Sequence, residues 1–152
     1  MKTLKNNRIW KASDMLITLV LYYMMGVALH EYWHANVARI LGYSASAHFH
    51  WFSGWVDLPV FPTNPLHIIL IGIVGGGGVA LFYILISLFT NDWETKMVLN
   101  LFAPLHGTYA ICEVLYLFEL ISIQVLAVIP IVITVSILIW TNRKAIVEKI
   151  RG

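Results

Sequence analysis

Two histidines and a glutamate stand close together in the first apolar segment, in the pattern H-E-Y-W-H at residues 30–34. His30 and His34 are four residues apart, so on a helix they share one face and can bind a single metal ion. Glu31 is turned by about 100° from His30, which leaves its carboxylate free to hold a water molecule beside the metal. The pattern predicts zinc-activated hydrolysis with Glu31 as the general base.

The surroundings of this motif place it in a membrane-spanning helix. A nearly uninterrupted apolar run, residues 15–29, leads directly into it. A charged side chain at bilayer depth costs about 2.5–3.5 kcal/mol on insertion scales, and such residues usually have a function. Metal coordination would remove this penalty. The alternative is that the histidines and the glutamate only form a satisfied polar cap at the wet end of a helix.

A second polar cluster lies in the third apolar segment. Pro104 and Gly107 predict a kinked or locally unwound helix there, which is tolerated where it is buried or lines a cavity. His106 lies inside this break, and we expect it to be the third metal ligand. Glu113 follows seven residues later, on the same helix face but about two turns away. We therefore expect Glu113 to support the ligands, to line a cavity or to pair with another subunit.

The loop at residues 43–64 is rich in aromatic residues and contains no Lys or Arg. Alternation around residues 47–51 predicts a short strand or hairpin, and the aromatic side chains indicate that it lies against the membrane. His48 and His50 would share one face of such a strand. They could bind a metal ion, or they could be interfacial residues without a special role.

Composition indicates a polytopic membrane protein. The chain has 152 residues, of which 59% are hydrophobic and 12% charged, whereas a soluble domain has about a quarter charged residues. From a net charge of +2 we expect no nucleic-acid partner. We predict an all-α bundle in a single membrane domain, residues 1–152, with basic termini. The transmembrane helices are expected at about residues 14–41, 65–90, 96–120 and 121–140.

Four consecutive glycines, residues 75–78, lie in the second predicted helix. Small residues allow another helix backbone to approach closely. The run predicts a tight helix crossing, and the thin segment could also lie against the metal-binding helix and leave room for a substrate strand.

Basic residues predict the orientation in the cell membrane. Four precede the first helix and four lie in the C-terminal tail, whereas the aromatic loop has none. By the positive-inside rule, both termini are expected in the cytoplasm and the loop outside.

The order of these motifs resembles the intramembrane zinc metalloproteases of the site-2 protease class. The matching segments are HEYWHANVARILG, then GGGGVALFYILISL, then NLFAPLHG at residues 100–107, and together they cover roughly residues 20–115. The resemblance implies that His30 and His34 are zinc ligands, that Glu31 is the catalytic base and that Asn100 positions the substrate.

The chain departs from that class at several positions. His106 stands where the class has its third ligand, an aspartate, and Trp33 stands where the class usually has a glycine. The glycine run also lacks the usual proline and asparagine, and the predicted orientation puts the site nearer the outside than is usual for the class.

Three functions remain open from the sequence. The first is a membrane-embedded zinc metallopeptidase that cleaves transmembrane peptide substrates in or near the bilayer. The second is a non-catalytic accessory subunit that binds partner membrane subunits in a larger complex. The third is a metal transporter or metal sensor that uses His48, His50 and the intramembrane histidines.

Overall fold

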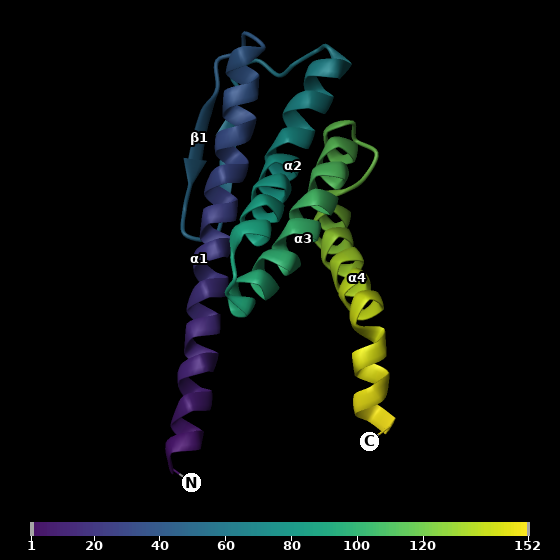
Figure 1. Cartoon of the computed structure of the whole chain (residues 1–152). Coiled ribbons are helices and arrows are strands. Elements are labelled where there is room, and N and C mark those ends of the chain that lie inside the picture. The colour runs from purple at the N-terminus through teal and green to yellow at the C-terminus, as the bar shows by residue number, and fades with distance from the viewer. Residues whose placement is uncertain (1, 152) are drawn as a thin grey trace.

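Four long helices and one short β-hairpin make up the computed structural model (Figure 1). The structure describes residues 2–151, with the side chains of residues 11, 13–141 and 143. In chain order the elements are α1 (Lys2–Ile40), β1 (Ser46–Phe49), β2 (Gly54–Asp57), α2 (Pro65–Phe89), α3 (Trp93–Leu117) and α4 (Ile123–Arg151). This confirms the predicted all-α class, with a hairpin between the first two helices.

Each helix contains a segment that is long and apolar enough to cross a bilayer, and the chain is therefore a multi-pass membrane protein. The four segments are Ser13–Ile40, Pro65–Phe89, Trp93–Leu117 and Ile123–Thr141. Large apolar side chains such as Leu88 and Phe89 are exposed on the outside of the bundle, as lipid-facing side chains are. The start of α1 and the end of α4 lie at the same end of the molecule (Figure 1).

The first helix is longer than the sequence predicted. It begins at Lys2 rather than near residue 14, because residues 2–13 contain no proline or glycine to stop it. Its C-terminus follows the prediction: Gly42 has a φ of 89°, and the Tyr43 N–H donates to the Ala38 carbonyl at 2.9 Å. This left-handed glycine ends α1 and turns the chain toward the hairpin.

The third helix runs without interruption through Pro104 and Gly107, which corrects the predicted local unwinding. A proline removes one backbone donor, and a helix packed between neighbours tolerates that loss. The Thr108 hydroxyl donates to the Pro104 carbonyl at 2.9 Å. α3 also begins and ends three residues earlier than expected, because Asp92 caps its N-terminus. α4 continues through the basic tail, beyond the predicted end at residue 140.

The hairpin lies along the C-terminal half of α1 (Figure 1). Its strands are antiparallel, and the register pairs His48 with Trp55 and Phe49 with Gly54. The hairpin expected around residues 47–51 is therefore present, and β2 brings Gly54 next to Glu31 of the H-E-Y-W-H motif.

The glycine run at residues 75–78 is where α2 meets both of its partner helices. A Cβ atom at Gly75 would overlap the imidazole ring of His34 on α1. A Cβ atom at Gly76 would overlap the carbonyl oxygen of His106 on α3. The predicted tight crossing is thus confirmed, and the thin segment does lie against the helix that carries the two histidines.

The other two glycines of the run differ from each other. A Cβ atom at Gly78 would lie 3.1 Å from the Trp33 ring, whereas one at Gly77 would have no neighbour within 4 Å. Close approach therefore explains Gly75, Gly76 and Gly78, and Gly77 has no such contact.

Candidate metal centre

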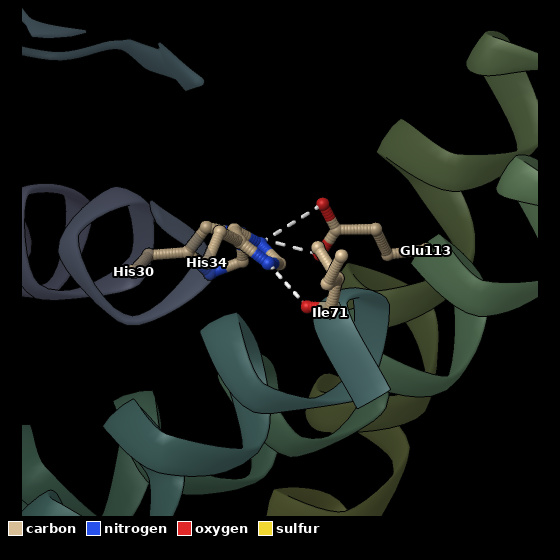
Figure 2. Close-up of polar contacts among 4 residues, drawn as sticks. All are labelled: His30, His34, Ile71 and Glu113. Atoms are coloured by element: carbon tan, nitrogen blue, oxygen red, sulfur yellow. Dashed lines mark hydrogen bonds and ion pairs between the residues drawn. The ribbon is translucent and has the colours of Figure 1, made fainter. Parts of the chain in front are cut away.

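His30, His34 and Glu113 converge on one point between α1 and α3. Figure 2 shows the two imidazole rings projecting from α1 toward the Glu113 carboxylate. The two histidine Nε2 atoms lie 2.8 Å apart. Glu113 Oε2 lies 3.2 Å from His30 Nε2, and Glu113 Oε1 lies 3.1 Å from His34 Nε2. In the described part of the chain, these three residues form a group able to hold a metal ion.

A backbone carbonyl fixes the orientation of His34. Its Nδ1–H donates to the carbonyl oxygen of Ile71 on α2 at 2.5 Å. In a neutral imidazole the proton on Nδ1 leaves a lone pair on Nε2, and that lone pair faces His30 and Glu113. Hydrogen bonding of the second ring nitrogen to a carbonyl is the usual support of a metal-binding histidine.

The donor atoms fit a zinc ion. Zinc–nitrogen and zinc–oxygen bonds of about 2.0–2.2 Å in a tetrahedral site separate neighbouring ligand atoms by roughly 3.3 Å. The two distances to Glu113 are close to this value, and the 2.8 Å between the two histidine nitrogens is shorter. Glu113 Oε2 is also buried without a hydrogen-bond partner among the described residues. Buried carboxylates are normally paired or coordinated, and among the described residues this oxygen faces His30 Nε2 at 3.2 Å. Two histidines and one glutamate are the ligand set of several zinc peptidases.

His106 is not part of this group, although the sequence predicted it as the third ligand. Its ring centroid lies 6.1 Å from that of His30, and its Nε2 atom is buried without a hydrogen-bond partner in the described structure. A Cβ atom at Gly26 would lie 2.8 Å from this nitrogen and 2.6 Å from the Tyr83 hydroxyl. His106 thus packs toward α1 about two turns away from Glu113. Glu113 lies beside the two histidines, in the position expected for His106.

Asn100 lies far from the converging residues. The Ser87 hydroxyl donates to its Oδ1 at 3.4 Å. Asn100 is thirteen residues before Glu113 on α3, which corresponds to roughly 20 Å along the helix, and it lines neither of the cavities described next. Its expected role in positioning a substrate therefore gains no support from its location.

Glu31 lies beside the group and faces the hairpin. A Cβ atom at Gly54 of β2 would overlap the Glu31 side chain, so the absence of a side chain at Gly54 allows the strand to pass directly over this carboxylate. Glu31 does not belong to the group of three possible ligands. No hydrogen bond joins its carboxylate to any described residue, and its role as a general base stays a prediction.

Two cavities meet at this point. One, of about 380 Å³, extends past His106 toward α4. The other, of about 520 Å³, extends past His34 and Glu113 along the hairpin. Both are lined by His30, Glu31, Gly54 and Tyr109. The polar groups are therefore reached from both sides, through space large enough for a short peptide segment.

Comparison with protein-family models, with curated proteins and with solved structures finds no match to this chain. The function is therefore inferred from the geometry of the site.

Sequence reasoning recognised Glu113 as an unusual intramembrane carboxylate but gave it a lesser role, and it did not single out Tyr109. The spacing of His106, Tyr109 and Glu113 is i, i+3 and i+7, which is one face of a helix. That spacing was the available signal. This spacing does not reveal which of the three residues lies at the same height along the bundle as His30 and His34. That height is set by the way α2 and α3 cross.

Proposed function

We propose that this chain is a membrane-embedded zinc metallopeptidase that hydrolyses peptide bonds in or near transmembrane segments. The observation that carries the proposal is the convergence of His30, His34 and Glu113, with Glu31 beside them where two cavities meet. In this proposal the order of motifs places the enzyme in the site-2 protease class. Glu113 would supply the carboxylate ligand from a different position than in that class.

Each residue of the site has its own role in the proposed reaction. His30, His34 and Glu113 would hold zinc, which supplies a Lewis acid that lowers the pKa of water. Glu31 accepts a proton from the attacking water and later donates it to the leaving amine.

The open space beside Glu31, where the two cavities meet, favours a catalytic role over a purely structural one. Trp33, which the sequence placed next to the second histidine, lies against Gly78 and lines neither cavity. It therefore does not fill the space beside Glu31. The alternative of a non-catalytic accessory subunit predicts that replacing Glu31 has no consequence for proteolysis.

The test compares cells that express wild type with cells that express Glu31→Gln. This substitution keeps the shape of the side chain but removes the base. We expect peptide fragments of membrane proteins, identified by mass spectrometry of new N-termini, in wild type only. Purified Glu31→Gln should retain as much zinc as wild type, measured by elemental analysis. Glu119→Gln, at an exposed position beyond α3, is the matched control and should cleave normally.

The same fragments in Glu31→Gln cells would remove Glu31 from its role. Wild-type protein purified without metal, and unable to take up zinc, would contradict the metal centre itself.

A further inference from the structure

Tyr109 occupies a special place among the residues around the metal centre. It is the α3 residue that lines both cavities, together with His30 and Glu31 of α1. It lies one helical turn before Glu113, on the same face of α3. Its ring meets that of His30 edge to face, with centroids 5.4 Å apart and planes inclined by 75°. A substrate that passes from one cavity to the other must therefore pass Tyr109.

The Tyr109 hydroxyl is an available donor. No hydrogen bond links it to any residue that the structure describes, and it is not among the fully buried polar atoms. His106 lines the first cavity too, but its Nε2 atom is sealed against the Gly26 backbone. Of the two, only the tyrosine has a donor that is free to meet a ligand.

We infer that Tyr109 is a catalytic residue that stabilises the oxyanion of peptide hydrolysis. The inference rests on the proposed function. As water attacks the carbonyl carbon, Glu31 takes one proton from that water and the π electron pair moves to the carbonyl oxygen. The Tyr109 O–H donates a hydrogen bond to this oxyanion without transferring its proton. When the carbonyl re-forms, the C–N bond breaks and Glu31 passes its proton to the departing nitrogen. A preorganised donor of this kind contributes about 10²–10³-fold to the rate in enzymes that acylate or hydrolyse.

The test uses the whole protein loaded with cobalt(II) and titrated with acetohydroxamate, an anionic ligand with a carbonyl oxygen. Visible absorption reports both cobalt coordination and hydroxamate binding. We expect Tyr109→Phe to keep the cobalt spectrum of the wild type and to bind acetohydroxamate about tenfold more weakly, because a hydrogen bond to a charged group is lost. Tyr116→Phe is the matched control on the same helix. It lines only the second cavity and should bind as wild type does.

Each other outcome overturns the inference. Equal hydroxamate affinity in Tyr109→Phe and wild type would remove the donor role and leave the metal centre standing. Loss of cobalt from Tyr109→Phe would make Tyr109 a packing support for His30 instead. A wild type that binds no cobalt would refute the metal centre and the tyrosine role together.

Discussion

Two regions of this protein pair histidine with a carboxylate at nearly the same distance, and their surroundings differ. On the hairpin, His48 Nε2 lies 3.0 Å from Asp57 Oδ2, and the two side chains are 43% and 62% exposed. In the bundle, the two histidines lie 3.1–3.2 Å from Glu113, and their side chains are only 6–9% exposed. The comparison shows that proximity alone does not distinguish a candidate metal site from a surface ion pair.

Burial and orientation make the difference. An exposed ion pair contributes about 0–1 kcal/mol, because water solvates both partners. His48 also stacks on Trp55 with ring centroids 5.1 Å apart, which satisfies its ring without a metal. In the bundle a second imidazole is added, and the Ile71 carbonyl fixes the tautomer of His34. The part of the transporter or sensor hypothesis that uses His48 and His50 therefore has less support than the part that uses the intramembrane histidines.

The largest expected effect is a difference in zinc affinity between a substitution in the bundle and a substitution on the hairpin. Glu113→Gln removes the charged ligand, and we expect zinc affinity to fall by more than about 100-fold, since even supporting partners of metal ligands contribute 10–100-fold. Competition with a chelator of known affinity measures this. Asp57→Asn should leave zinc affinity unchanged.

His106→Ala is the second control in that experiment, because His106 lies outside the group. Retention of one zinc ion is expected. Loss of zinc from His106→Ala together with retention in Glu113→Gln would restore the sequence-based ligand set and break the comparison.

A smaller effect is expected from substitutions in the glycine run of α2, where the helix backbone packs against His34. Gly75→Ala places a methyl group against the His34 ring, and overpacking of this kind costs about 1–3 kcal/mol. We expect a lower unfolding temperature in detergent and loss of zinc. Gly77→Ala, two residues along the same helix, meets open space and should change stability by less than about 1 kcal/mol while keeping zinc. Equal behaviour of the two variants would mean that Gly75 does not hold the site open.

The smallest effect concerns a third carboxylate, Asp92, which lies outside the membrane-spanning segments and is fully exposed. Hydrogen bonds from the side chain and backbone of Thr95 lower its pKa below the usual 3.8. Its carboxylate therefore stabilises α3 above about pH 4, and this contribution is lost as pH falls through the lowered pKa.

Asp92→Asn keeps a capping side chain but cannot titrate. The unfolding temperature of wild type should therefore fall relative to this variant when the pH is taken below 3.8. Parallel curves at all pH values would contradict the role of the charge.

Local patterns predicted the elements better than the site. Apolar runs, Pro65 and Gly42 located the membrane helices and two of their ends, since these signals act within a few residues. The H-E-Y-W-H pattern predicted that His30 and His34 face one point. The sequence pointed to His106 as the third ligand because Pro104 suggested a break centred on it, whereas the structure places Glu113 beside the two histidines.

Which residue of α3 reaches the two histidines depends on how deeply α2 and α3 interlock at Gly76. That depth follows from the packing of two whole helices. A periodic pattern identifies the face of α3 that carries His106 and Glu113, but it does not give their height relative to α1.

The packing of α4 has a consequence for the cavity beside Glu31. Among the described elements, α4 packs closely against α3 alone. Yet its residues Ala127, Pro130 and Ile131 form one wall of the cavity beside Glu31. A wall held by a single neighbour yields more easily than one held by several. An outward displacement of α4 would enlarge this cavity without moving His30, His34 or Glu113, which lie on helices that pack against each other and against α2.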